Sequence, residues 1–326
     1  MARVRLAVAL LLPEQVAPEV DGLRRAFGAD PSYIAPHITL VPPVNIGDDE
    51  VPETLAILRR AAAGVDPPLR LTLGPFDTFL PRNPVIYLAV GGSPDHVTAL
   101  RDACWDGPFG RPETRPYVPH VTVTRGLSPE DDATVRRLLG RYEREVEIDR
   151  LHLLAQVADP DRGRHWVPTA DAAFGPRRMI GTGGVEIELS VSTLADPEAR
   201  RFLVDHGCDV ALPTGHWRSI VVAGRMEGSV AGVAWGRQAG RAAVLDHIFV
   251  APAARRTGLA GHLVAAVEHD VARHGGAVLE ALPPLDEPGA RTLAARGWTE
   301  RPGPGGPRLW RALGPDDLGQ SNSIEA

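Results

Sequence analysis

The sequence contains no lysine, and it contains 35 arginines. This absence excludes enzymes that form a lysine Schiff base, and it excludes a Walker-type phosphate loop, whose lysine binds the phosphates. Cysteine is scarce too, with only Cys104 and Cys208, one in each half of the chain. Two such residues cannot build a disulfide framework or a cysteine-rich zinc site, so we expect a reducing, cytoplasmic environment and no structural metal.

Long hydrophobic runs are also missing. The apolar residues 6–12 follow two arginines and imitate a short signal peptide, but no small-residue cleavage pattern comes after them, so we interpret them as a first buried strand. No segment approaches the roughly 20 apolar residues of a membrane helix. The formal net charge of −6 also excludes a general nucleic-acid surface, although it is compatible with a small phosphate ligand or a single RNA end.

The length of 326 residues favours two domains, and the 34 glycines and 31 prolines indicate many turns. Strand and helix patterns alternate up to about residue 158 and dissolve over residues 159–184, which are rich in Pro, Gly and Arg. We therefore predict one domain at residues 1–175, a second at residues 183–313, and a disordered polar tail at residues 314–326.

The alternating patterns predict a mixed α/β (α+β) fold in each domain. In the first domain we expect strands at residues 4–11, 38–41, 69–73, 85–90, 118–124 and 146–155, and helices at residues 14–27, 51–63, 96–104 and 129–142. In the second we expect strands at residues 185–191, 219–223, 229–236, 242–250 and 277–282, and helices at residues 196–206, 259–275 and 289–296.

A short internal repeat stands out in the first domain. Residues 36–40 read PHITL and residues 119–123 read PHVTV, and each copy follows a tyrosine. We call these segments the first and second motif. Because alternate residues of a strand point to the same face, each motif presents one imidazole and one hydroxyl together, His37 with Thr39 and His120 with Thr122.

Two histidines with two threonines suit hydrolysis or transfer at a phosphodiester. One imidazole can take a proton from the nucleophile while the other gives one to the leaving oxygen, and the hydroxyls and Arg125 can bind the phosphoryl oxygens. For a single copy, a polar residue at a strand end is the simpler interpretation, but two copies with shared flanks favour function. A metal site is a third alternative, for which this set of side chains is a poor ligand set.

These motifs give residues 1–170 a resemblance to the two-histidine phosphoesterase superfamily, which includes 2′-5′ RNA ligase-like proteins and RNA 2′,3′-cyclic phosphodiesterases. The resemblance implies two pseudo-symmetric α/β lobes around a central groove. It further implies that His37 acts as proton donor and His120 as proton acceptor, with Thr39 and Thr122 holding the phosphate. The implied substrate is a small nucleotide or an RNA end that carries a 2′,3′-cyclic phosphate.

In the second domain, a predicted strand runs through an Arg- and Gly-bearing turn into a long helix. The turn, residues 255–261, reads RRTGLAG, and Leu259, Leu263, Val264, Val267 and Val271 form one apolar helical face. Backbone N–H groups in such a turn, with the positive end of the helix, favour a pyrophosphate. Taken alone, the turn is equally consistent with a plain helix start that carries two surface arginines.

Its context, Val250-x-Pro252 followed by R-x-x-G-x-A, resembles the acetyl-CoA motif of GNAT N-acetyltransferases over residues 185–313. The resemblance implies a GNAT fold with a mixed central sheet and acetyl-CoA as the cofactor. The residues that it assigns to CoA are Phe249, Val250, Arg255, Arg256, Thr257, Gly258, Leu259, Ala260 and Gly261.

The catalytic groups of the second domain are less well defined. Many family members place a tyrosine four residues before the Gly-aromatic pair, here Gly297-Trp298, and this chain has Leu293 there. Asp246 or His247 on the central strand could serve as general base, or either could be a structural or exposed polar residue. The acyl acceptor is an amine that the sequence does not identify.

Three hypotheses follow. In the first, the chain is a bifunctional enzyme that joins a metal-independent phosphodiesterase, or a related RNA-end ligase, to an acetyl-CoA-dependent N-acetyltransferase. In the second, only the acetyltransferase turns over, and the histidine motifs bind a nucleotide-like acceptor. The third is a non-catalytic regulatory protein that binds CoA and a nucleotide. The presence of both His37 and His120 favours the first.

Overall fold

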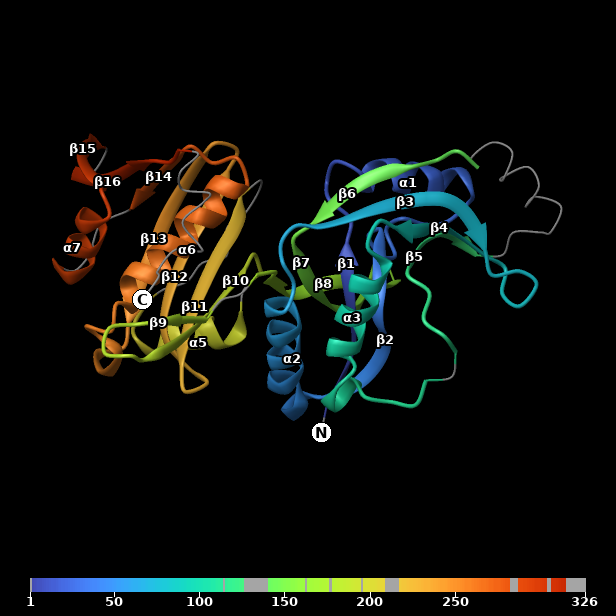
Figure 1. The fold of residues 1–326 in the computed structure, drawn as a ribbon, viewed down its shortest axis with the longest axis horizontal. Helices are drawn as coiled ribbons and strands as arrows, with labels where there is room; N and C mark the ends of the chain where they lie inside the picture. The colour runs from blue at the N-terminus through green and yellow to red at the C-terminus, as the bar shows by residue number, and fades with distance from the viewer. Residues whose placement is uncertain are drawn as a thin grey trace. The chain divides into compact units, whose positions relative to one another are not determined.

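The computed structural model describes residues 2–113, 115–125, 140–161, 163–175, 178–194, 196–208, 217–281, 287–303 and 306–314. It divides into two compact units, Met1–Pro176 and Arg177–Ala326, whose elements are labelled in Figure 1. The described residues include no helix that is long and apolar enough to cross a membrane. Apart from Gly314, the tail predicted to be disordered lies outside the described residues.

The first unit is a sheet with helices. Its strands are β1 (Arg3–Leu11), β2 (His37–Gly47), β3 (Leu69–Thr78), β4 (Val85–Gly91), β5 (His120–Arg125), β6 (Arg144–Ile148), β7 (Arg150–Asp159) and β8 (Gly163–Ala173). Its helices are α1 (Ala17–Ala26), α2 (Val51–Ala63) and α3 (Pro94–Cys104), with short 3₁₀ turns η1 (Asp48–Glu50) and η2 (Gly107–Phe109). Most of the helix predicted at residues 129–142 falls outside the described residues.

The strands form one eight-stranded sheet in the order β6-β3-β4-β5-β2-β1-β7-β8, and every pairing is antiparallel. The order repeats itself about the β5–β2 junction. A β1–α1–β2 segment on one side corresponds to β4–α3–β5 on the other, and each is flanked by two further strands. The predicted pseudo-symmetric arrangement is therefore present, and the two motifs lie at its centre.

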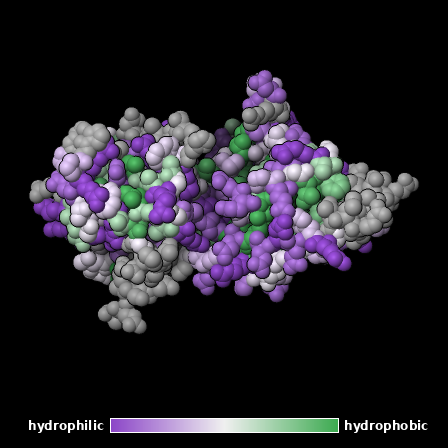
Figure 2. Space-filling view, turned by 90° about the horizontal axis from the view of Figure 1, so that it is seen from above, coloured by the Kyte–Doolittle hydropathy of each residue, from purple (hydrophilic) through white to green (hydrophobic). Residues whose placement is uncertain are grey.

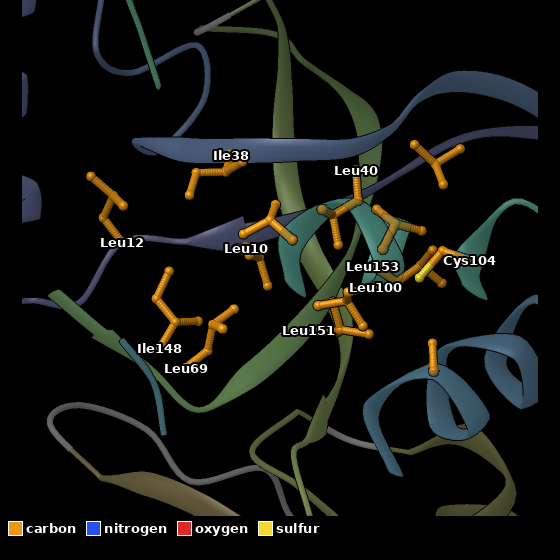
Figure 3. Close-up of a cluster of buried hydrophobic side chains, with 14 of the residues drawn as sticks. Leu10, Leu12, Ile38, Leu40, Leu69, Leu100, Cys104, Ile148, Leu151 and Leu153 are labelled. Atoms are coloured by element: carbon orange, nitrogen blue, oxygen red, sulfur yellow. The ribbon is translucent and has the colours of Figure 1, made fainter. Parts of the chain in front are cut away.

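Apolar side chains from both halves of the sheet form one core. Figure 3 shows Leu10, Ile38 and Leu153 of the sheet in one buried cluster with Leu100 and Cys104 of α3. All of these are at most 3% exposed. Because Ile38 belongs to the first motif and points into this core, His37 and Thr39 must face the other way.

The structure corrects two sequence predictions in this unit. The strand expected at residues 146–155 is two strands, β6 and β7, which lie in opposite halves of the sheet; Asp149 separates them and accepts hydrogen bonds from Arg150. The segment expected to be irregular from residue 159 contains β8, an eleven-residue strand paired with β7. Pro168 lies opposite Leu154, where the register shifts, so the sheet accommodates a residue that usually ends a strand.

The second unit contains a second eight-stranded sheet. Its strands are β9 (Arg178–Ile180), β10 (Glu186–Ser192), β11 (Arg218–Met226), β12 (Ser229–Ala239), β13 (Ala242–Val250), β14 (Val278–Ala281), β15 (Thr299–Gly303) and β16 (Gly306–Ala312). Its helices are α5 (Pro197–Asp205), α6 (Leu259–Arg273) and α7 (Glu287–Ala295), with the 3₁₀ turn η3 (Pro252–Ala254). β9 falls within the segment expected to be irregular, so that expectation is wrong there as well.

The sheet of the second unit is mixed, as predicted. Its order is β15-β16-β14-β13-β12-β11-β10-β9, and only β13 and β14 pair in parallel, connected through α6. The helix lies close against the sheet because two strand positions lack side chains. A Cβ at Gly224 would lie 2.5 Å from Leu259 Cδ1, and one at Gly232 would lie 3.0 Å from Leu259 Cδ2.

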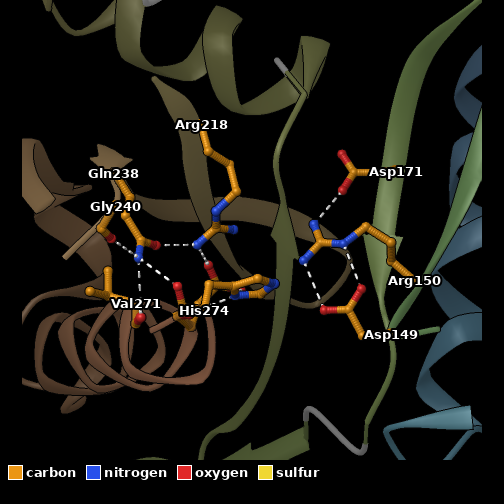
Figure 4. Close-up of polar contacts among 9 residues, drawn as sticks. Asp149, Arg150, Asp171, Arg218, Gln238, Gly240, Val271 and His274 are labelled. Carbon is orange, nitrogen blue, oxygen red and sulfur yellow. Dashed lines mark hydrogen bonds and ion pairs between the residues drawn. The ribbon is translucent and has the colours of Figure 1, made fainter. Parts of the chain in front are cut away.

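Each unit also buries a polar network, and Figure 4 shows one from each. In the first unit, Arg150 donates to Asp149 and Asp171. In the second, Arg218 donates to Gln238 and Asp270, each at 2.7 Å. Figure 2 shows that hydrophilic residues cover most of the visible face of each unit, with apolar residues in small patches. These hydrogen bonds satisfy most of the polar groups that the networks bury, whereas Arg218 Nη1 is buried without a hydrogen-bond partner among the described residues.

Candidate functional site

The two motifs meet at the centre of the first sheet. β2 and β5 share one registered pair, Ile38 with Val121, and both side chains are fully buried in the core. Because side chains alternate along a strand, the histidine and threonine of each motif lie on the opposite, partly exposed face. The structure therefore brings together all four residues that the sequence singled out, His37, Thr39, His120 and Thr122.

Both histidine rings are held in the same way. His37 Nδ1 lies 2.8 Å from the carbonyl oxygen of Ala35, and His120 Nδ1 lies 2.8 Å from that of Val118, two residues upstream in each case. A carbonyl oxygen can only accept, so Nδ1 carries the proton in both rings and donates it. In the neutral ring Nε2 then holds a lone pair, which makes it the atom that exchanges protons with a substrate.

The surroundings favour the neutral form of both rings. Burial lowers the pKa of His37 to about 4; the hydrogen bond to Ala35 opposes this, and the charges of Arg24, His120 and Arg125 add to it. The pKa of His120 is lowered as well, first by burial and then by Arg125, against the hydrogen bond to Val118. Both rings are thus neutral imidazoles at neutral pH, with the lone pair on Nε2.

Arg125 lies at the exposed end of β5, and its charge acts on both histidines. That the guanidinium binds a phosphate between the rings stays a prediction.

Sequence reasoning missed two side chains that donate hydrogen bonds to the backbone of the motifs. Arg24 Nε donates to the backbone oxygen of Thr122 at 3.1 Å, and the Tyr117 hydroxyl donates to that of Thr39 at 2.9 Å. A signal for Arg24 was present, since it follows Val20 by four residues and so falls on the apolar face of α1. The tyrosine was noticed as a flank of the second motif, but nothing in its spacing revealed its partner.

Aromatic rings surround His120. Phe79 and Tyr87 stack with their centroids 4.3 Å apart, and each forms a T-shaped pair with the imidazole, at centroid distances of 5.0 and 5.3 Å. Tyr87 faces Thr122 across the β4–β5 ladder. No pattern in the sequence indicated these contacts, because they depend on the register between two strands more than 30 residues apart.

In the second unit, the predicted anion-binding turn lies between η3 and α6. Gly258 is the N-cap residue of α6 and has φ +85°, a conformation that favours glycine, and a Cβ there would come no closer than 3.6 Å to Thr182 Oγ1. A Cβ at Gly261 would meet nothing within 4 Å. Arg255 and Arg256 are exposed. The turn therefore opens toward solvent beside the first helical turn, whose N–H groups have no partner within the helix, and it fits a pyrophosphate. One of these groups, the N–H of Leu259, donates to Thr257 Oγ1 at 3.4 Å.

The remaining residues assigned to CoA surround this turn. Leu259 is buried beneath it, Ala260 is partly exposed, and the Thr257 hydroxyl donates to the backbone oxygen of Ala254 at 2.8 Å. Upstream, the Arg255 side chain donates to the backbone oxygen of Val250. These contacts fix the backbone of the turn, whereas the anion would bind to its N–H groups.

Asp246 directly follows the last parallel pair of β13 and β14 that the described residues contain. The last registered pair is Leu245 with Ala281, and β13 continues beyond it. Asp246 is also the extra residue of a β-bulge, because Leu245 pairs with Gly236 while His247 pairs with Trp235. Its carboxylate lies 3.3 Å from the Arg237 guanidinium, yet burial outweighs that charge and raises the pKa of Asp246.

Phe249 lies farther along β13 and packs against α5. Its ring centroid lies 4.5 Å from that of His206 and 5.8 Å from that of Phe202. The ring thus faces α5, whereas Val250, the next residue, points to the α6 side of the sheet.

The Gly-aromatic end of the predicted motif is structural. Trp298 Nε1 donates to Glu268 of α6 at 2.7 Å, and Arg296 and Arg311 pair with the same carboxylate, which is 2% exposed. Leu293 is fully buried in the second unit.

Among the described residues, no three metal-ligating side chains gather at one place. Metal independence therefore remains a prediction.

Comparison with known proteins matches the two units to different families. Residues 12–160 match the 2′-5′ RNA ligase superfamily, and residues 190–298 match the acetyltransferase (GNAT) family. A predicted phosphoesterase from Bacillus cereus strain G9842 is 30% identical over 156 residues, which is 47% of this chain and 90% of the relative. The same figures hold for a predicted phosphoesterase from Bacillus thuringiensis strain Al Hakam.

Solved structures resemble the chain in parts. Escherichia coli LigT in complex with 3′-AMP is 20% identical, with 53% of this chain and 99% of LigT covered and a TM-score of 0.40. A protein from Klebsiella pneumoniae described as an acyl-CoA N-acyltransferase is 17% identical, with 39% of this chain and 98% of that protein covered and a TM-score of 0.33.

Proposed function

Because the chain belongs to the 2′-5′ RNA ligase superfamily through its first unit and carries a GNAT acetyltransferase domain in its second, we propose that it is a bifunctional enzyme. The first unit hydrolyses a 2′,3′-cyclic phosphodiester of a nucleotide or RNA end without a metal. The second transfers an acetyl group from acetyl-CoA to an amine.

The observation that supports the first activity is the pair of imidazoles held alike by Ala35 and Val118 on one face of the sheet. His120 Nε2 takes a proton from water, the water oxygen bonds to phosphorus, and the bond from phosphorus to one ribose oxygen breaks. His37 Nε2 gives its proton to that oxygen, and the product is a phosphomonoester. The threonine hydroxyls and Arg125 bind the phosphoryl oxygens. With the hydroxyl of a second RNA end in place of water as the nucleophile, the same step would join two RNA ends.

The acid role of His37 requires its proton, which a ring with a pKa of about 4 lacks at neutral pH. A bound phosphodiester supplies a negative charge between the rings and thus raises both pKa values. The substrate would therefore help to protonate the group that later donates the proton to it.

The test is hydrolysis of nucleoside 2′,3′-cyclic monophosphates, and of an RNA with a cyclic phosphate end, by the purified protein in EDTA. We expect turnover in the wild type, and a loss of about 10³-fold or more in His37→Ala and in His120→Ala, because each removes one proton-transfer group. His96→Ala, which changes an exposed histidine of α3, is the matched control and should keep full activity.

Turnover that requires a metal would contradict the mechanism. No turnover on any of these substrates would favour the second hypothesis, in which the motifs only bind a nucleotide-like acceptor.

Two observations support acetyl transfer as the activity of the second unit: the open turn at Gly258, and the carboxylate of Asp246, which lies at the β-bulge of β13 and has a raised pKa. Acetyl-CoA supplies the acetyl group as a thioester. The N–H groups at the start of α6 would hold its pyrophosphate, and the backbone of Phe249 and Val250 would pair with its pantetheine. Asp246 would take the proton that the acceptor amine must lose before it attacks.

The test of this activity is acetylation of a panel of amines by wild type and Asp246→Asn. We expect kcat to fall about 100-fold or more in the variant, because the amide cannot accept the proton, while acetyl-CoA affinity stays the same. Unchanged kcat would assign the base elsewhere. Binding of acetyl-CoA without transfer to any amine would favour the third, regulatory hypothesis for this unit.

A further inference from the structure

Backbone pairing between the two motifs is short. Ile38 with Val121 is the single registered pair between β2 and β5 in the described part of the chain. The backbone oxygens of Thr39 and Thr122, which adjoin this pair, accept hydrogen bonds from side chains. What sets the spacing of His37 and His120 must therefore be sought in these side chains.

Arg24 connects the two motifs from α1. Its Nε donates to the backbone oxygen of Thr122 in the second motif, and its Nη1 donates to that of Ile34 at 2.8 Å. Ile34 directly precedes Ala35, whose carbonyl orients the His37 ring. Asp21, one turn earlier on α1, lies 3.4 Å from the same Nη1. The planar guanidinium of Arg24, a residue that is 5% exposed, thus connects the segment before the first motif to the strand of the second.

Tyr117 makes the converse connection. Its hydroxyl donates to the backbone oxygen of Thr39 in the first motif. Tyr117 directly precedes Val118, whose carbonyl orients the His120 ring. Its own ring lies under the guanidinium of Arg101, 5.4 Å from the ring centroid, and Arg101 is a buried residue of α3. α3 occupies the place in the second half of the unit that α1 occupies in the first.

The two connections therefore follow one rule. Ile34 and Tyr117 each precede the residue whose carbonyl orients a histidine. Arg24 connects Ile34 to the threonine carbonyl of the second motif, and Tyr117 itself donates to the threonine carbonyl of the first.

We propose that Arg24 and Tyr117 are reciprocal positioning residues that set the distance and orientation of the two imidazoles. This inference rests on the proposed phosphodiesterase activity and adds to it the part of the chain that aligns the proton-transfer groups. Neither side chain takes part in the proton transfers themselves.

Arg24 contributes both a positive charge and a pair of hydrogen bonds, and a single substitution would not tell the two contributions apart. Three cationic or titratable groups face His37: Arg24 from α1, and His120 and Arg125 from β5, and each lowers its pKa. Arg24→Lys keeps the positive charge but loses the planar fork that donates in two fixed directions, whereas Arg24→Met loses both. Tyr117→Phe removes a single hydroxyl and keeps the ring.

The experiment measures kcat, KM and the titration of ¹⁵N-labelled histidines in the full-length protein. We expect Arg24→Lys, Arg24→Met and Tyr117→Phe to lower kcat about 10- to 100-fold with little change in KM, because misplaced groups slow the chemical step. The His37 pKa should rise in Arg24→Met and stay near its wild-type value in Arg24→Lys. Arg25→Met, at an exposed neighbour on α1, is the matched control and should change none of these.

Each substitution should also be detected in the opposite motif: Tyr117→Phe should shift the ring resonances of His37, and Arg24→Met those of His120. Wild-type kcat in Tyr117→Phe and Arg24→Lys, or a loss of activity no greater than the loss of folded protein measured by circular dichroism, would overturn the inference. The resonances can be measured without turnover. An inactive wild type that still shows both cross-motif shifts would therefore refute the proposed activity and leave the positioning role standing.

Discussion

At the scale of single residues, the proposed activity of the first unit depends on two imidazoles whose hydrogen bonds and pKa values differ from those of histidine in water. Both donate Nδ1–H to a backbone carbonyl, and burial lowers the pKa of both. Repetition of the motif in the sequence identified His37 and His120 as partners. It did not show their shared hydrogen-bond geometry, because the carbonyls of Ala35 and Val118 are offered by backbone whose course only the fold determines.

The pH dependence of kcat/KM follows from these pKa directions. That quantity reports the free enzyme: the rate falls below the pKa of the base and above the pKa of the acid. Both values lie below the usual 6.5, and that of His37 is about 4. We therefore expect a maximum below pH 6.5 and a decline as the pH rises further, measured with a nucleoside 2′,3′-cyclic monophosphate. A maximum above pH 7 would contradict the assigned protonation states.

At the scale of elements, prolines mark the limits of what the sequence could predict. α2 and β13 have the predicted bounds, since their apolar patterns are regular and continuous. β8 was missed because Pro168 interrupts its pattern, and the β-bulge that accommodates it depends on the partner strand. β3 likewise continues past its predicted end through Pro75, which also lies at a register shift.

The start of α6 gives a prediction of its own. Gly258→Glu places a carboxylate and a side chain in the open turn, so we expect acetyl-CoA binding, measured by calorimetry, to be abolished by repulsion and occlusion. Gly275→Glu is the matched control, because Gly275 also has a positive φ and no neighbour within 4 Å of an added Cβ, but follows the other end of α6. Equal affinities in the two variants would remove the turn from the CoA site.

At the scale of the whole molecule, the chain consists of two units with separate cores. The composition and the loss of pattern near residue 175 predicted two domains, and the structure divides after Pro176. Every residue of the main core of the first unit lies between Leu6 and Phe174. The family of each unit could be predicted from its motif, whereas the side chains that hold the two motifs together could not.

Separate cores predict separate folding. A fragment of residues 1–176 should unfold in one cooperative transition and keep the kcat/KM of the full chain toward cyclic phosphates, because no residue assigned to that reaction lies outside it. The measurements are thermal denaturation by circular dichroism and steady-state kinetics. A fragment that folds but has lost activity would show that the second unit contributes to the first site.

The β-bulge in β13 has an evolutionary consequence. Asp246 is the extra residue between two registered stretches, so a one-codon deletion there would leave Leu245 opposite Gly236 and His247 opposite Trp235. Elsewhere in the strand, the same deletion would move the side chains of one stretch to the opposite face of the sheet and so expose its apolar residues. The proposed base thus occupies the position that a descendant gene could lose most easily while it still encodes a folded protein. Such a descendant would retain the turn for CoA without the carboxylate for transfer.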